Sequence, residues 1–314
     1  MTRAFIFPGQ GSQYIGMGKT LAENFAEARE VFETVNESLK QDLTKIMFEG
    51  PEGDLNLTEN TQPALMAVSL AVMEVLRKQG KLDLEKSCQF VAGHSLGEYS
   101  ALTAARSFNL SDTARLLKLR GQSMQKAVPV GIGAMAAILG MDFEPVQAVA
   151  KEASKPGSLC QAANDNSVGQ VVISGHKDAV ERAIALATER GAKKAVLLPV
   201  SAPFHCDLMA PAAEVMNEAL AAALIHEPVV PVVANVTAQA VSDPTQIRTL
   251  LVDQITGTVR WRESVLWMKA QGVTEMVEIG SGKVLAGLVK RIDKDILCES
   301  VGEPAQIEEF LKKL

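Results

Sequence analysis

A strand, a tight turn and a helix around Ser95 constrain the fold of this chain more than any other feature. The apolar run 90–92 predicts a short buried strand, and the Ala- and Leu-rich run 96–106 predicts a helix. Between them, Gly93-x-Ser95-x-Gly97 places a glycine two residues before and two residues after the serine. In a tight strand-to-helix turn, side chains at those two positions would collide, and the serine hydroxyl points outward. The spacing therefore predicts a nucleophile elbow, the turn that presents a reactive serine.

The pattern alone does not establish a reactive serine, because a motif with three fixed positions arises by chance fairly often. Its position between a predicted strand and a predicted helix favours the catalytic interpretation. The backbone N–H of Leu96 lies at the N-terminus of that helix, beside the hydroxyl of Ser95. There it can stabilise an oxyanion that develops during attack on a carbonyl group.

Length and composition indicate a globular protein. The 314 residues suffice for one large domain or two smaller ones, and a hydrophobic content of 47% is ample for a core. No stretch without charged residues is long enough to span a bilayer, and the N-terminus lacks the apolar segment and cleavage site of a signal peptide. We therefore expect a cytoplasmic protein without a membrane partner. The net charge of −6 argues against a nucleic-acid partner.

Cysteine usage argues against a metal site and against a disulfide framework. The four cysteines, Cys88, Cys160, Cys206 and Cys298, are widely separated and show no C-x-x-C spacing. We expect four free thiols and no bound metal.

Two further helices are predicted on either side of the elbow. One runs from about residue 62 to residue 79, with Thr61 as its cap and Gly80 as its stop. The other begins at Ser111, which can cap it, and runs to about Val128.

Arg120 lies on the apolar face of the second of these helices, four residues after Leu116 and four before Met124. Burying a guanidinium without an anionic partner would cost several kcal/mol. Two interpretations follow: an internal ion pair with an Asp or Glu of the protein, or a clamp for the carboxylate of a substrate. The residues alone favour the ion pair.

The pattern changes between about Val130 and Val200. Strands are predicted at 134–139, 158–164, 170–174 and 193–199, and helices at 145–153 and 178–190. The order βαββαβ is that of a ferredoxin-like unit. We therefore expect an α/β protein in which a small domain, residues 130–199, is inserted into a large domain made of residues 1–129 and 200–314.

A serine nucleophile needs a base, and His205 is the best placed of the four histidines. His94 is held inside the elbow, His176 begins a helix of the small domain, and His226 ends a helix. His205 lies instead in a Pro-containing loop ahead of a long Ala-rich helix. A histidine is more often a surface or core residue than a base, but here the elbow requires one.

Several separated motifs resemble, in order and spacing, those of the malonyl-CoA:acyl carrier protein transacylases of dissociated (bacterial type II) fatty acid synthesis. The matching residues are Phe7-Pro8-Gly9-Gln10-Gly11-Ser12-Gln13, Gly93-His94-Ser95-Leu96-Gly97-Glu98, Arg120, Ser201-Ala202-Pro203-Phe204-His205 and Glu278-Ile279-Gly280-Ser281-Gly282. The resemblance covers essentially the whole chain. It implies an α/β-hydrolase-like large domain with a ferredoxin-like insertion, in agreement with the order of elements above.

The resemblance also implies catalytic roles. Ser95 would attack the malonyl thioester with His205 as the general base. The backbone N–H groups of Leu96 and Gln10 would form the oxyanion hole. An ordinary α/β-hydrolase orients its histidine with an acid, whereas this family uses a backbone carbonyl group, which here would be that of Gln254.

Substrate recognition follows from the same resemblance, which reverses the interpretation of Arg120. In the family this arginine grips the malonyl carboxylate with both arms of its planar fork. Phe204 matches a bulky residue of malonyl-selective relatives, and Gln62 matches a position in the acyl pocket. Malonyl-CoA and holo acyl carrier protein would react in turn through a malonyl-serine intermediate, by ping-pong kinetics. The partner carries the phosphopantetheine, so we expect no resident cofactor, and we expect a monomer.

Three alternatives remain open at this stage. A serine esterase or thioesterase would use the same elbow and base but transfer the acyl group to water; Arg120 and the absence of an HGGG-type loop favour transfer to a thiol. A discrete acyltransferase of a polyketide pathway would share the catalytic residues. A non-enzymatic scaffold would make no use of the elbow, the base and the arginine together.

Overall fold

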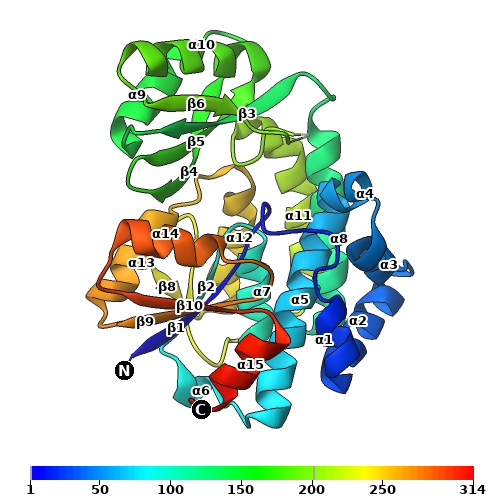
Figure 1. Ribbon diagram of the computed structural model, residues 1–314. Coiled ribbons are helices and arrows are strands. Elements are labelled where there is room, and N and C mark those ends of the chain that lie inside the picture. Colours follow the sequence, from blue (N-terminus) through cyan, green and yellow to red (C-terminus); the bar gives the residue numbers. More distant parts are fainter. Residues whose placement is uncertain (1, 201) are drawn as a thin grey trace.

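The computed structural model describes residues 2–200 and 202–314 as a mixed α/β protein with two β-sheets (Figure 1). The larger sheet has six strands in the order β10-β9-β1-β2-β7-β8. Their bounds are β1 Arg3–Phe7, β2 Phe90–Gly93, β7 Val232–Val233, β8 Ala240–Val241, β9 Glu275–Ile279 and β10 Leu297–Val301. Neighbouring strands are parallel except at the edge, where β7 and β8 are antiparallel.

The central strand β1 separates two hydrophobic cores. Alternate side chains of a strand point to opposite faces of the sheet, so Phe5 and Phe7 join one core while Ala4 and Ile6 join the other. Both faces are covered, which explains why β1 after Arg3 and the whole of β2 are apolar runs without polar alternation.

Helices cover both faces of the larger sheet (Figure 1). The smaller core contains α13 Trp261–Ala270 and α14 Val284–Ile292. The remaining helices of this part are α1 Lys19–Asn24, α2 Ala26–Leu39, α3 Leu43–Glu49, α4 Glu52–Asn56, α5 Thr58–Gln79, α6 Leu84–Ser87, α7 Gly97–Ala104, α8 Leu110–Ala127, α11 Ala210–Ala222, α12 Pro244–Thr256 and α15 Pro304–Leu311, with a 3-10 turn at Asp207–Met209. Helix α5 packs against α8 and is buried along nearly its whole length.

The second sheet is formed by one continuous segment. Its elements follow in the order β3 Gly133–Leu139, α9 Phe143–Ala153, β4 Cys160–Ser167, β5 Gln170–His176, α10 Lys177–Glu189 and β6 Lys194–Leu197, as the sequence predicts. The four strands are antiparallel in the order β4-β5-β3-β6. The sheet and its two helices enclose a third hydrophobic core.

Strand β4 fixes the second sheet to the larger unit. The N–H of Asp165 donates to the carbonyl group of Val259, and the N–H of Val259 donates to that of Ala163, both at 2.9 Å. The side chain of Asp165 is buried and pairs with Arg262 Nε at 2.9 Å. These contacts hold β4 beside the segment that leads into α13.

The predicted helix caps are wrong, although both helices are present. Helix α5 begins earlier, so Thr61 lies inside it and its hydroxyl donates to the carbonyl group of Leu55. Helix α8 is capped by Asn109, whose side chain accepts the N–H of Asp112, and Ser111 lies within the first turn. The predicted stop at Gly80 is confirmed.

Two expectations from composition can be compared with the structure. All four cysteines are free thiols. Across residues 2–200 and 202–314, no helix combines the length and the apolar character needed to cross a bilayer.

Candidate active site

The turn between β2 and α7 has the tight geometry predicted from its glycines. Ser95 adopts a φ of 53°, a left-handed conformation that residues other than glycine rarely adopt. A Cβ atom on Gly93 would lie 1.9 Å from the backbone of Gly97. A Cβ atom on Gly97 would lie 2.3 Å from the carbonyl oxygen of Phe7. Only glycine fits at either position, and Ser95 is held at the apex.

Ser95 and His205 are in direct contact. The hydroxyl Oγ lies 2.8 Å from His205 Nε2, and His205 Nδ1 lies 2.8 Å from the carbonyl oxygen of Gln254. A carbonyl oxygen only accepts, so Nδ1 carries the proton and Nε2 is free to accept the hydroxyl proton of Ser95. Burial, followed by the nearby Arg120 cation, lowers the pKa of His205 to about 3, so the imidazole is neutral at neutral pH.

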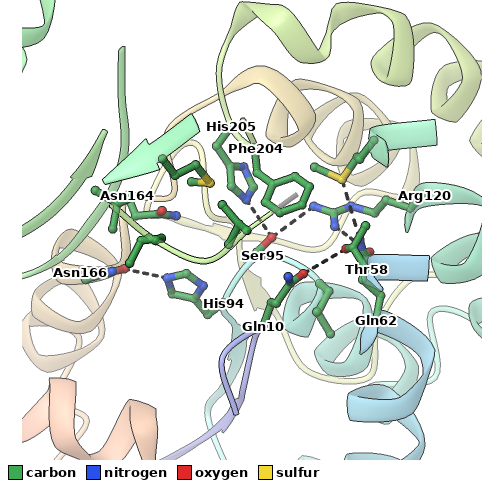
Figure 2. Close-up of a pocket in the computed structure, with 16 residues that line it drawn as sticks. Gln10, Thr58, Gln62, His94, Ser95, Arg120, Asn164, Asn166, Phe204 and His205 are labelled. Atoms are coloured by element: carbon green, nitrogen blue, oxygen red, sulfur yellow. Dashed lines mark hydrogen bonds between the residues drawn. The ribbon is translucent and has the colours of Figure 1, made fainter. Parts of the chain in front are cut away.

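Arg120 reaches the same hydroxyl from another side (Figure 2). It is 1% exposed, and its Nη2 donates to Ser95 Oγ at 3.2 Å and to Gln254 Oε1 at 2.7 Å. Its Nη1 donates to Gln62 Oε1 at 2.7 Å. The face of the ring of Tyr99 lies 5.7 Å from the guanidinium carbon.

The internal ion pair that the residues alone favoured is wrong. Among residues 2–200 and 202–314, no salt bridge within 4.0 Å joins the guanidinium to a carboxylate, and the Nε of Arg120 has no hydrogen-bond partner. Helical periodicity correctly placed Arg120 on a buried face, but the side chains opposite that face are neutral amides. Arg120 is almost completely buried, so its cation is poorly solvated, and this burial lowers its pKa. Such a group can bind a carboxylate.

Two residues that sequence reasoning did not single out hold the elbow through hydrogen bonds. Asn235, just after β7, accepts the N–H of Ser95 at 2.8 Å and donates to the carbonyl group of Gly93 at 2.7 Å. Glu98 is 2% exposed and accepts Gln254 Nε2 at 2.7 Å and the N–H of Asn235 at 3.1 Å. Glu98 could have been suspected from its place in the elbow motif; Asn235 has no local signal.

A cavity of about 160 Å³ opens at Ser95 (Figure 2). It is lined by Gln10, Thr58, Gln62, His94, Ser95, Leu96, Arg120, Met124, Met135, Asn164, Asn166, Val172, Leu198, Val200, Phe204 and His205. The volume is below the ~300–1,000 Å³ of pockets for drug-sized ligands, so it suits a short acyl group. Strands β3, β4 and β5 supply part of the lining, so the cavity lies between the two sheets.

The structure brings the predicted site residues together. Gln10 lines the cavity beside the elbow, with its Oε1 accepting the hydroxyl of Thr58 at 3.0 Å. Phe204 is 8% exposed and forms a wall next to the base. Ser201, the first residue of its motif, lies outside the described residues. Within the described ranges, no three His, Cys, Asp or Glu side chains gather in a way that could hold a metal ion.

A serine in a strand-to-helix turn, paired with a neutral histidine, is the arrangement of enzymes that form acyl-serine intermediates. The family model of the acyl transferase domain matches residues 4–303. The chain therefore belongs to the acyl transferase family, and within it to the malonyl CoA-acyl carrier protein transacylases, which confirms the resemblance seen in the sequence.

Individual relatives match over nearly the full length. The malonyl CoA-acyl carrier protein transacylase of Bacillus subtilis is 46% identical over 311 residues, covering 99% of this chain and 96% of the relative. That of Escherichia coli is 44% identical over 309 residues, with 98% of both chains covered. A crystal structure of the acyl-carrier-protein-S-malonyltransferase from Bartonella henselae is 55% identical and superposes with a TM-score of 0.97 over 100% of this chain and 99% of the other.

Proposed function

We propose that this protein transfers a malonyl group from malonyl-CoA to the phosphopantetheine thiol of holo acyl carrier protein, and so supplies malonyl carrier protein for fatty acid biosynthesis. The observation that carries the proposal is the 3.2 Å contact between Nη2 of the buried Arg120 and Ser95 Oγ. A cation without a carboxylate partner, beside a reactive hydroxyl, suits an acyl group that bears its own carboxylate. The names of the relatives support the same reaction.

In the first half-reaction, Ser95 Oγ attacks the thioester carbonyl while its proton moves to His205 Nε2, 2.8 Å away. The backbone N–H groups of Leu96, at the start of α7, and of Gln10 stabilise the oxyanion. Collapse breaks the carbon–sulfur bond, and the CoA thiolate leaves with the proton from His205. The carbonyl group of Gln254 holds the imidazole in the tautomer that this exchange needs.

In the second half-reaction, the phosphopantetheine thiol gives its proton to His205 and attacks the malonyl-serine ester. Ser95 leaves and takes that proton back, which restores the free enzyme. Because malonyl-CoA and holo acyl carrier protein use the same site one after the other, the kinetics are ping-pong. No step requires a resident cofactor, since the thiol arrives with the partner.

Selection of the malonyl group rests on three side chains around the cavity. Arg120 binds the malonyl carboxylate with both arms of its fork, and an acetyl group offers no such contact. Gln62 holds Nη1 of Arg120 through its Oε1 at 2.7 Å. Phe204 narrows the cavity beside the base, where it would crowd an α-methyl group.

We also propose that the chain has two domains. The parallel sheet with helices on both faces supports an α/β-hydrolase-like large domain of residues 1–129 and 200–314. The strand order β4-β5-β3-β6 and its separate core support a ferredoxin-like small domain of residues 130–199. We propose a monomer whose partners are malonyl-CoA and holo acyl carrier protein.

A polyketide carrier protein is a second candidate acceptor. A malonyl-transacylase has been solved in complex with its type II polyketide synthase acyl-carrier protein. The matching chain is 41% identical to this chain and superposes with a TM-score of 0.96, covering 100% of both chains. The catalytic residues serve either carrier protein, so the acceptor is decided by the transfer rate to each.

Intact-mass measurement with malonyl-CoA, before and after addition of holo acyl carrier protein, tests the proposal. We expect a malonyl adduct that maps to the Ser95 peptide, is absent in Ser95→Ala, and disappears when the carrier protein is added. Ser100→Ala is the matched control, because Ser100 is buried in α7, the helix that follows Ser95, and makes no side-chain hydrogen bond. If malonate and CoA accumulate without an adduct or transfer, water is the acceptor and the esterase alternative replaces the proposal.

A further inference from the structure

The side-chain amide of Gln254 has a donor end and an acceptor end in different surroundings. Its Nε2 donates to Glu98 Oε2 at 2.7 Å and to the carbonyl oxygen of Ser95 at 3.0 Å, with Asn235 Oδ1 at 3.3 Å. Its Oε1 accepts Nη2 of Arg120 at 2.7 Å. Acceptors surround one end and a cation faces the other, so only one orientation of the amide satisfies both ends.

Glu98 is the acidic member of this group. It lies in the first turn of α7, is 2% exposed, and receives two donors on the single atom Oε2: Gln254 Nε2 and the backbone N–H of Asn235. An oxygen that receives two N–H donors acts as an acceptor whether or not the carboxyl group is ionised, so Oε2 requires the donor end of Gln254 to face it. A buried carboxylate is costly to maintain, and nothing in the reaction steps above uses it.

We propose that Glu98 is a positioning residue that acts through the amide of Gln254: it holds Oε1 toward Arg120 and thereby keeps the guanidinium directed at the substrate carboxylate. This inference rests on the proposed malonyl transfer. If the amide turned over, its NH₂ group would face the guanidinium, and two donors would compete in a buried space.

Two further observations support this role. The carboxyl group of Glu98 lies on the far side of Gln254 from Arg120, so in its ionised form it partly offsets a buried cation that has no direct ion pair. The backbone carbonyl group of the same Gln254 holds His205. Gln254 therefore contacts both Arg120, through its side chain, and His205, through its backbone. Displacement of its side chain affects Arg120 more directly than His205.

The test measures kcat and KM for malonyl-CoA and for acetyl-CoA, each corrected for the fraction of enzyme that forms an acyl adduct. Glu98→Met removes the acceptor, whereas Glu98→Gln keeps one oxygen where the two donors meet. We expect Glu98→Met to lower the malonyl-to-acetyl ratio of kcat/KM by about tenfold or more, mainly through a higher KM for malonyl-CoA. We expect Glu98→Gln to retain the ratio within about threefold.

A double-mutant cycle tests whether Glu98 acts through Gln254. Gln254→Leu keeps the backbone carbonyl group but removes the amide, and should lower the ratio as Glu98→Met does. In that background, adding Glu98→Met should change the ratio by less than about twofold. Glu278→Met is the matched control, because Glu278 is also fully buried and accepts two backbone N–H groups, at the start of α14 away from the cavity. It should leave the ratio unchanged.

Three results would overturn the inference. An unchanged ratio in a folded Glu98→Met would mean a purely structural role. If that variant does not fold, an unchanged ratio in Gln254→Leu would have the same meaning. If the two substitutions lowered the malonyl-to-acetyl ratio independently, so that their effects multiplied in the double variant, Glu98 would not act through Gln254. A wild-type enzyme that forms no malonyl-serine would instead refute the proposed function itself.

Discussion

Replacing Arg120 with methionine separates a substrate clamp from a structural ion pair. Methionine fills much of the same buried volume but has no positive charge. A malonyl carboxylate would then enter the cavity without a partner. Leaving a buried charge unpaired costs about 3–5 kcal/mol, which corresponds to a decrease in kcat/KM for malonyl-CoA of between about 150- and 5,000-fold. Acetyl-CoA has no carboxylate, so its kcat/KM should decrease far less.

The stability of the same variant should change little. The substitution removes a poorly solvated cation, which is favourable, and leaves Gln62 Oε1 and Gln254 Oε1 without their donor, which is unfavourable. These effects have opposite signs, so we expect the free energy of unfolding to change by less than about 2 kcal/mol.

Arg262→Met is the control, because Arg262 pairs with the buried carboxylate of Asp165 at 2.9 Å. It should lose about 3 kcal/mol of stability and keep its preference for malonyl-CoA.

The assays are steady-state kinetics with both thioesters and urea unfolding of each variant. Two results would refute the reasoning. If Arg120→Met lost about 3–5 kcal/mol of stability while its preference for malonyl-CoA persisted, Arg120 would be a structural residue. If both thioesters lost activity equally, Arg120 would act on the nucleophile or the base and not on the malonyl carboxylate.

Three further predictions concern the base, the turn and the cavity wall. A base works only when it is unprotonated, and the lowered pKa of His205, about 3, places its protonation below the assay range. Burial raises the pKa of Glu98 to about 7, so Glu98 would itself titrate within that range, and the measurement therefore uses Glu98→Gln. The profile of kcat/KM against pH for Glu98→Gln should therefore show no decrease on the acid side between about pH 5 and 8. A decrease centred near the ordinary histidine pKa would contradict the lowered pKa of His205. Gly93→Ala should yield no folded protein by circular dichroism, because its Cβ would lie 1.9 Å from the backbone of Gly97. The control Gly287→Ala, with open space around the added atom, should leave stability unchanged or increase it. A natively folded Gly93→Ala enzyme would mean that the turn is not as tight as described. Phe204→Ala should raise kcat/KM for methylmalonyl-CoA relative to malonyl-CoA by about tenfold or more, measured by competition, and an unchanged ratio would exclude Phe204 as the residue that crowds the α-methyl group.

Features that depend on neighbouring residues could be predicted from the sequence. The turn around Ser95 is one, because Gly93 meets the backbone of Gly97 within five residues of chain, although the close contact of Gly97 itself is with the distant Phe7. The order of elements from β3 to β6 is another, since each strand or helix has its own period of apolar residues. Local rules still failed at the helix caps, where several polar residues compete and packing selects the first turn: Asn109 and not Ser111 caps α8.

The roles of Gln254 and Phe204 came from the family resemblance and not from local pattern, whereas His205 was already the best-placed base among the four histidines and the resemblance agreed with it. No rule of spacing relates His205 to Ser95, 110 residues earlier in the chain. Matching several separated motifs to a known family supplied that information, because related chains preserve the same long-range contacts. Glu98 lay within a matched motif, but the match did not indicate which atoms it contacts.

Only the tertiary structure decided what surrounds Arg120. The helical period places its side chain on a buried face, but it does not say whether an acid or an amide lies opposite, since that depends on segments distant in sequence. Gln62 is 58 residues away from Arg120 and Gln254 is 134 residues away. Sequence periodicity thus determined that this cation is buried, and the folded chain determined that its partners are neutral, which leaves it available to a substrate carboxylate.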